Sequence, residues 1–161
     1  MLKLKTRTKI KTEDIKNIEK IVKSTEVFSK DEIKTAKELI ITQLNNPKDS
    51  YRFVFLEDDD KVVGYTCFGK IPLTKDNYDL YWIAVMKSSH NQGFGKILME
   101  KTEQVIKKSK GRAVYIETSS EPKYKNTRKF YLKNGYTQIA KFPNFYKEND
   151  RIVYSFSFSF N

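Results

Sequence analysis

The residues with the clearest chemical potential lie near the middle of the chain, where an apolar run leads into polar residues and two closely spaced glycines. The apolar run is Trp82–Met86, the polar residues are Lys87–Gln92, and the glycines are Gly93 and Gly95. Glycines let a ligand approach the backbone closely, and the first turn of a helix offers unpaired N–H groups with a partial positive charge. This pattern predicts a phosphate-binding site formed by His90, Asn91, Gln92, Gly93, Phe94, Gly95 and Lys96.

Two common phosphate-binding motifs do not fit this spacing. A dinucleotide-binding Gly-x-Gly-x-x-Gly motif needs a glycine where Leu98 stands, and a Walker A loop needs one where His90 stands. Two glycines at a helix start also fit a plain tight turn between a strand and a helix. Because His90 is the only histidine, a histidine-based zinc cluster is excluded, and we expect no metal.

The chain is strongly basic, with 31 Lys and Arg residues against 20 Asp and Glu residues and a formal net charge of +11. Such a charge suits nucleic acid, anionic lipid or an anionic cofactor. Only five of the basic residues are arginines, the residues that supply bidentate contacts to bases, and the lysines are spread over every segment. We therefore expect most of this charge to be a solvated surface and do not expect nucleic acid as a partner.

The length of 161 residues predicts one domain over residues 1–161. A single cysteine, Cys67, excludes an internal disulfide framework and favours a reducing compartment such as the cytoplasm. The first residues, MLKLKTRTKIK, lack the apolar core of a signal peptide. No apolar stretch approaches the length of about 18 residues that spans a membrane, so no membrane is expected as a partner.

Helices and strands must position the glycine-rich segment. Helical spacing predicts a helix with Thr12 as its N-cap and a second helix opened by the capping box Ser29–Glu32. A helix is expected over Gly93–Ser109 with Gly111 as its C-terminal cap, and a short one over Thr127–Asn134 capped by Gly135. Alternating apolar runs predict strands at residues 2–5, Tyr51–Leu56, Lys61–Phe68, Asp79–Val85, Ala113–Thr118, Tyr136–Tyr146 and Arg151–Phe160, with Glu57–Asp60 as a hairpin turn. The order β-αα-βββ-α-β-α-ββ predicts an α/β (mixed α+β) fold whose mixed sheet has helices on both faces.

Three segments together resemble the GNAT superfamily of N-acetyltransferases: Asp79–Val85, Gln92–Gly95 and Phe130–Tyr136. The family's pyrophosphate motif is Arg/Gln-x-x-Gly-x-Gly/Ala at a helix start, and a later motif places Tyr four residues before Gly and an aromatic, as Tyr131, Gly135 and Tyr136 are here. One departure is His90, which stands where the motif begins with Arg or Gln. The resemblance covers nearly the whole chain and implies a mostly antiparallel sheet of six or seven strands with about four helices.

The resemblance also implies an activity, namely direct transfer of an acetyl group from acetyl-CoA to a primary amine of a small molecule or protein. In this family the backbone at Ile83, Ala84 and Val85 would pair with the pantetheine arm, and Tyr131 would protonate the departing thiolate. Asn126 and Arg128 would meet the 3′-phosphate and ADP part of coenzyme A. A homodimer is compatible with the resemblance. A buried packing role for Tyr131, a non-catalytic acetyl-CoA-binding domain and a basic nucleic-acid-binding module are the alternatives.

The group that deprotonates the amine is open at this point. Period 2 places Asp79, Tyr81, Ile83 and Val85 on one face of a strand, so Asp79 is a candidate base. Glu117 on the next strand is its rival, and a chain of waters is a third option. The net charge predicts an acceptor that is anionic or zwitterionic, unless a local pocket lined by Asp79 and Glu117 overrides that field.

Overall fold

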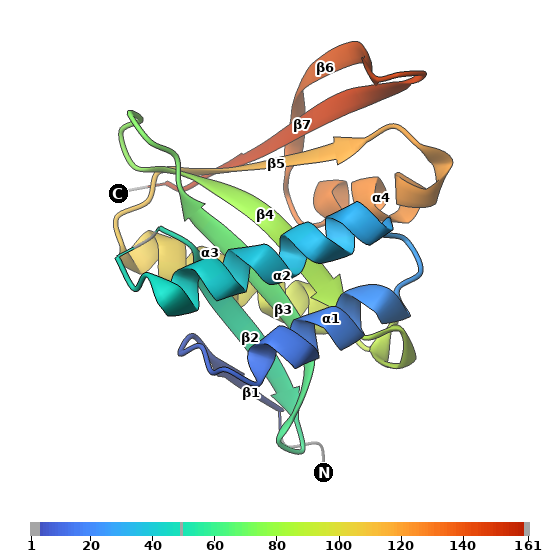
Figure 1. Cartoon of the computed structure of the whole chain (residues 1–161). Helices are drawn as coiled ribbons and strands as arrows, with labels where there is room; N and C mark the ends of the chain where they lie inside the picture. Colours follow the sequence, from blue (N-terminus) through green and yellow to red (C-terminus); the bar gives the residue numbers. More distant parts are fainter. Residues whose placement is uncertain (1–3, 49, 160–161) are drawn as a thin grey trace.

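The computed structural model of the protein describes residues 4–48 and 50–159. Seven strands form one sheet in the order β1-β2-β3-β4-β5-β7-β6 (Figure 1). The strands are β1 (Leu4–Arg7), β2 (Arg52–Asp58), β3 (Lys61–Lys70), β4 (Asn77–Val85), β5 (Ala113–Ser119), β6 (Thr137–Tyr146) and β7 (Asn149–Ser157). The helices are α1 (Asp14–Ser24), α2 (Lys30–Asn45), α3 (Phe94–Lys108) and α4 (Lys125–Lys133), with short 3₁₀ turns η1 (Lys87–Ser89) and η2 (Pro122–Tyr124). The expectations for Leu2, Lys3 and Phe160 lie outside the described residues.

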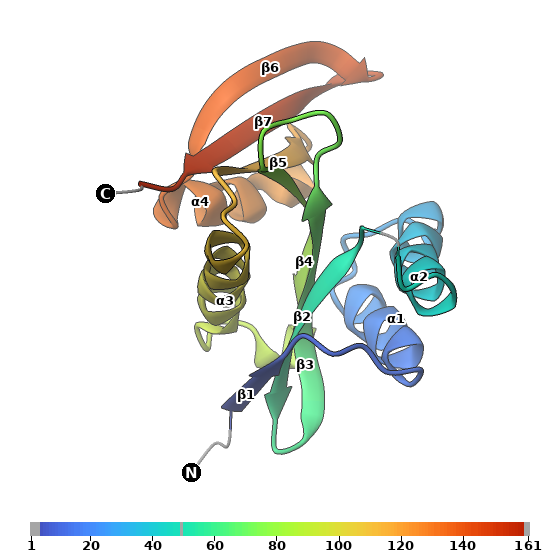
Figure 2. The same ribbon diagram turned by 90° about the vertical axis from the view of Figure 1, so that its left-hand side faces the viewer.

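The predicted fold class and order of elements are confirmed. All neighbouring strands pair antiparallel except β4 and β5, which are parallel. Figure 2 shows α1 and α2 on one face of the sheet and α3 and α4 on the other. Each face has its own apolar cluster, one around Ile18, Ile40 and Phe55 and the other around Leu98, Val114 and Tyr154. Within the described residues, no helix has the length and apolarity needed to cross a membrane.

The two N-terminal helices begin differently. The predicted capping box of α2 is confirmed, because the Ser29 hydroxyl accepts from the Glu32 N–H and the Glu32 carboxylate accepts from the Ser29 N–H. The predicted N-cap of α1 at Thr12 is wrong. Helix α1 begins at the buried Asp14, whose carboxylate takes two hydrogen bonds from the Arg7 guanidinium at 2.6 and 2.8 Å. A strand-to-helix ion pair therefore fixes this end in place of a local cap.

The glycines after α3 and α4 serve different purposes. Gly135 has φ +87°, the left-handed conformation expected of a C-terminal cap. After α3 that conformation belongs to Lys110 (φ +60°) and not to Gly111, whose N–H instead donates to the Ile106 carbonyl at 2.9 Å and so helps to close the helix. Gly111 is needed for space, because a Cβ there would lie 2.3 Å from the Ile106 side chain and 2.9 Å from Tyr78.

The regular alternation predicted for β4 is also wrong. Cys67 of β3 pairs with Trp82 while the adjacent Phe68 pairs with Leu80, so Tyr81 is an extra residue in a β-bulge. Before the bulge Leu80 packs into the cluster on the α3 face, and after it Ile83 does so. Asp79 therefore faces the α1–α2 side, and it does not share a face with Ile83 and Val85.

Candidate active site

A gap opens in the middle of the sheet where β4 and β5 separate. These parallel strands pair only at Asn77–Asp79 with Ala113–Tyr115 and then diverge (Figure 1). Two cavities occupy this region. We call the one of about 670 Å³ the α2-side cavity, because the α1–α2 loop and the first turns of α2 line it. The other, of about 850 Å³, is the α3-side cavity, lined by the start of α3 and by α4. The two cavities share Ile83, Ala84, Val85, His90 and Thr127.

The edge of β4 supplies free backbone groups where the cavities meet. The Met86 N–H donates to the Val63 carbonyl of β3 at 2.7 Å. In an antiparallel ladder alternate residues face the partner, so Ala84 faces β3 while the N–H and C=O groups of Ile83 and Val85 face the gap. The Val85 carbonyl already accepts a bond from His90 Nε2 at 2.8 Å. The remaining groups can pair with an extended ligand as a sheet pairs with an added strand.

The start of α3 forms a cradle of unpaired backbone N–H groups. Its N-cap is Gly93 in the left-handed conformation (φ +78°), which has no side chain to cap the helix. The N–H groups of residues 91–96 make no hydrogen bond within the described part of the chain, and the first intrahelical bond is from Ile97 N–H to the Gly93 carbonyl. Lys96 and Lys133 line the same cavity, and none of the residues that line it is acidic. Consecutive free N–H groups, a helix N-terminus and two ammonium groups suit phosphates.

Tyr131 brings a protonated hydroxyl to the α2-side cavity. The residue is only 5% exposed, and its hydroxyl makes no hydrogen bond within the described residues. Burial, and to a lesser extent Tyr154, raise the pKa of Tyr131 well above its usual value. The hydroxyl therefore keeps its proton at neutral pH and is available as a donor.

Of the two candidate bases, only Glu117 lines a cavity. Glu117 borders the α2-side cavity, and its carboxylate is paired with Arg151 of β7. Asp79 is half-buried and lines neither cavity. Burial, followed by repulsion from Glu117, raises the pKa of Asp79.

Comparison with known proteins agrees with this geometry. Residues 15–136 match the model of the acetyltransferase (GNAT) family. A protein from Desulfovibrio desulfuricans described as a GNAT-family acetyltransferase is 33% identical over 96% of this chain and 98% of its own, with a TM-score of 0.93. The chain belongs to the GNAT acetyltransferase family. No curated protein matches it.

More distant GNAT structures share the fold. The ribosomal-protein-S18-alanine N-acetyltransferase from Escherichia coli is 17% identical over 98% of this chain and 96% of its own, with a TM-score of 0.75. An aminoglycoside 6′-N-acetyltransferase solved with coenzyme A is 16% identical over 98% of both chains, with a TM-score of 0.74.

Most residues predicted for the cofactor lie together in this GNAT protein. The α3-side cavity is lined by Ile83, Ala84, Val85, His90, Asn91, Gly93, Phe94, Gly95, Lys96 and Asn126. Gln92 and Arg128 do not line it. Arg128 Nη1 donates to the carbonyls of Ser119 and Glu121, at 2.7 and 3.0 Å, and so ties the end of β5 to α4.

No residue of α1, α2 or the loop between them was predicted from the sequence to be functional. The α2-side cavity is also lined by residues of the α1–α2 loop, the first turns of α2, the segment after β5 and the end of β6. They are Thr25, Val27, Phe28, Ser29, Asp31, Glu32, Thr35, Glu121, Lys123, Tyr124 and Tyr146. The signal at the start of α2 was the capping box, which predicts a helix start and nothing about a ligand. The contact that brings α2 to the site joins Tyr124 Oη to Glu32 Oε1 at 3.0 Å, across 92 residues of sequence.

Proposed function

We propose that this GNAT acetyltransferase transfers an acetyl group from acetyl-CoA to a primary amine. The observation that carries the proposal is the meeting of two cavities at the free edge of β4. Acetyl-CoA would lie in the α3-side cavity, and the amine would enter through the α2-side cavity. The amine could then reach a thioester held beside Ile83–Val85.

The residues of the α3-side cavity fit acetyl-CoA. The N–H groups of residues 91–96 and the ammonium groups of Lys96 and Lys133 would hold the phosphates. A Cβ at Gly93 would meet nothing within 4 Å, so the space above the cradle is open. Coenzyme A bound to the similarly folded aminoglycoside 6′-N-acetyltransferase supports this choice of donor. Because His90 is bonded to the Val85 carbonyl, we assign it to ordering the β4 edge.

The pantetheine arm would run along β4 and pair with Ile83 and the Val85 N–H. One of these N–H groups, aimed at the carbonyl oxygen of the thioester, would stabilise the negative charge that develops there, an effect of about 3 kcal/mol when one such donor is removed. Acetyl-CoA supplies an acetyl group that is already activated as a thioester.

Two side chains would manage the protons. The new bond joins the amine nitrogen to the acetyl carbon, the carbon–sulfur bond breaks, and the electron pair of that bond leaves with the sulfur. The Tyr131 hydroxyl would give its proton to the sulfur, and Glu117, directly or through water, would take a proton from the amine. We assign this second role to Glu117 and not to Asp79, because only Glu117 lines the α2-side cavity.

Two measurements test the proposal. Acetyl-CoA at 100 times its dissociation constant should add about 2.7 kcal/mol to the free energy of unfolding and raise Tm by a few degrees. Release of free thiol should then depend on an added primary amine. A Tm that does not respond to millimolar acetyl-CoA but rises with oligonucleotides would refute the proposal in favour of a nucleic-acid-binding module.

A further inference from the structure

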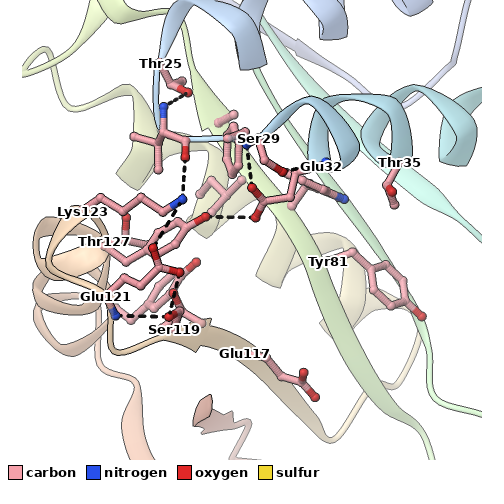
Figure 3. Close-up of a pocket in the computed structure, with 18 of the residues that line it drawn as sticks. Thr25, Ser29, Glu32, Thr35, Tyr81, Glu117, Ser119, Glu121, Lys123 and Thr127 are labelled. Carbon is pink, nitrogen blue, oxygen red and sulfur yellow. Dashed lines mark hydrogen bonds and ion pairs between the residues drawn. The ribbon is translucent and has the colours of Figure 1, made fainter. Parts of the chain in front are cut away.

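The two cavities have opposite charge. The α3-side cavity is lined by Lys96 and Lys133 and by no carboxylate. The α2-side cavity is lined by four carboxylates and one ammonium group, on a protein whose net charge is +11. The acids are Asp31, Glu32, Glu117 and Glu121, and the ammonium group is Lys123. Figure 3 shows Glu32 on the α2 side of this cavity and Glu117 and Glu121 on the β5 side.

Two of these carboxylates have a cationic partner and two have none. Glu117 pairs with Arg151, and Glu121 pairs with Lys123 at 3.6 Å. Glu32 binds only neutral donors, the Ser29 N–H and the Tyr124 hydroxyl. Asp31 makes no hydrogen bond or ion pair within the described residues. The two carboxylates without a cationic partner therefore both lie in the first turn of α2, where the helix N-terminus offsets part of their charge.

The rest of the cavity suits a small organic cation. Aromatic side chains line it, including Phe28, Trp82 and Tyr124, and their ring faces attract ammonium groups. Tyr146 also lines the cavity, and after burial the carboxylates of Glu117 and Glu32 both act to raise its pKa. The volume of about 670 Å³ lies within the range of small-molecule sites.

An independent feature marks the reacting end of this cavity. Tyr131 is only 5% exposed, its hydroxyl makes no hydrogen bond within the described residues, and the residue lines the same cavity. A hydroxyl that has no protein partner on so buried a side chain is free to bond a ligand in the cavity. The cavity thus has a reacting end at Tyr131 and a negative end at Asp31 and Glu32.

We propose that the acceptor is a small aliphatic amine with at least one further ammonium group, bound at Asp31 and Glu32. This inference rests on the proposed function and deepens it. It departs from the expectation drawn from net charge, because charges that line a cavity act at short range while the distant lysines are screened beyond about 8–10 Å. One amine reacts near Tyr131 while the second ammonium group offsets the charge of the first turn of α2.

A matched set of acceptors tests the proposal. Butane-1,4-diamine, 4-aminobutan-1-ol and 4-aminobutanoate differ only in the charge of the group remote from the reacting amine, and spermidine extends the set to a triamine. With acetyl-CoA saturating, we expect kcat/KM for the diamine or triamine to exceed that for the amino alcohol by about tenfold, since two carboxylate contacts each add a factor of up to about five. The amino acid should be the poorest acceptor.

The double variant Asp31→Asn/Glu32→Gln tests the residues. Gln is accepted at the third position of a capping box, so α2 should keep its start. We expect the preference for the diamine over the amino alcohol to fall at least about fivefold. The control is Glu38→Gln/Asp59→Asn, which removes two negative charges from exposed positions, one on α2 and one in the β2–β3 turn, that line neither cavity. It should keep the wild-type preference.

Several results would overturn the inference. One is a higher kcat/KM for the amino alcohol or the amino acid than for the diamine and triamine. A second is a preference for the diamine over the amino alcohol that is unchanged in Asp31→Asn/Glu32→Gln. A third is acetylation of peptide N-termini together with no acetylation of the diamine or the triamine. In each of these cases acetyl transfer is still observed, and the proposed function stands. A Tm that does not respond to acetyl-CoA would instead refute the proposed function itself.

Discussion

At the scale of single residues, the Tyr131 hydroxyl is the group whose loss is most informative. In Tyr131→Phe the ring and its packing beside Tyr154, with centroids 5.6 Å apart, survive. If the hydroxyl protonates the leaving sulfur, kcat should fall by roughly 10–1000-fold while acetyl-CoA affinity stays nearly unchanged. Tyr154→Phe is the matched control, because it removes the hydroxyl of another buried tyrosine, one that lines neither cavity. Steady-state kinetics measure kcat, and the acetyl-CoA-induced Tm shift reports the affinity for acetyl-CoA. Full activity in Tyr131→Phe would show that Tyr131 is a packing residue only.

The two strand carboxylates should respond differently to amidation. Glu117→Gln should lower kcat/KM at pH values below the pKa of the acceptor amine. Part of the lost activity should return at high pH, where the amine is already neutral.

Asp79→Asn should leave turnover largely intact. The pKa of Asp79 is raised by folding, so its ionisation weakens the fold above that raised pKa. Asp79→Asn should therefore raise Tm at neutral pH, and the gain should vanish in acid, where the wild-type carboxyl is protonated in both states. Loss of activity in Asp79→Asn alone would restore Asp79 as the base.

At the scale of elements, the turn from α3 into β5 depends on the missing side chain of Gly111. The Cβ of an alanine at this position would lie 3.0 Å from the Ile106 carbonyl oxygen, in addition to its contacts with two side chains. Because backbone cannot yield as a flexible side chain can, Gly111→Ala should lower the free energy of unfolding by about 1–3 kcal/mol. Urea denaturation measures this loss of free energy of unfolding. The control is Gly93→Ala, because a Cβ there meets nothing within 4 Å, so that variant carries the strain of a positive φ without crowding. Equal losses in the two variants would refute the crowding argument.

The elements also show how far sequence carries the fold and the site. The order of strands and helices, the capping box at Ser29 and the cradle at Gly93 follow from local spacing, and the structure has all three. The bulge at Tyr81 could not be predicted from local spacing, because one extra residue leaves a strand-like apolar pattern. It does, however, reverse which face of the sheet each residue before it points to. The place of α2 beside the cavity depends on a contact between Tyr124 and Glu32, which are far apart in the sequence. The bonds of Arg128 to the Ser119 and Glu121 carbonyls are local, but the residue pattern does not indicate them.

At the scale of the whole molecule, the cavity where the donor is proposed to bind differs from the other in charge, because Lys96 and Lys133 line it and no carboxylate does. Raising ionic strength from about 0.05 to 0.5 M should weaken acetyl-CoA binding several-fold, because exposed charges are then screened within a few ångströms. Lys133→Gln, which removes a cavity-lining ammonium group, should lessen that salt dependence. Lys129 lies on the same helix but lines neither cavity, so Lys129→Gln should leave the salt dependence unchanged. Calorimetric titrations measure acetyl-CoA affinity of the wild type and both variants at the two ionic strengths. An identical loss of affinity in all three proteins would contradict this charge distribution.

The divergence of β4 and β5 leaves a seam in the centre of the sheet, where other proteins have their best protected amides. The N–H groups of Ile83 and Val85 face this seam and have no strand to bond to. In the free protein we expect these two amides to exchange with deuterium much faster than that of Ala84, which faces β3. Acetyl-CoA should slow them selectively, because its pantetheine arm would complete the ladder. The donor would then act as a structural strand as well as a substrate, and exchange at Ile83 and Val85 that ignores acetyl-CoA would contradict this.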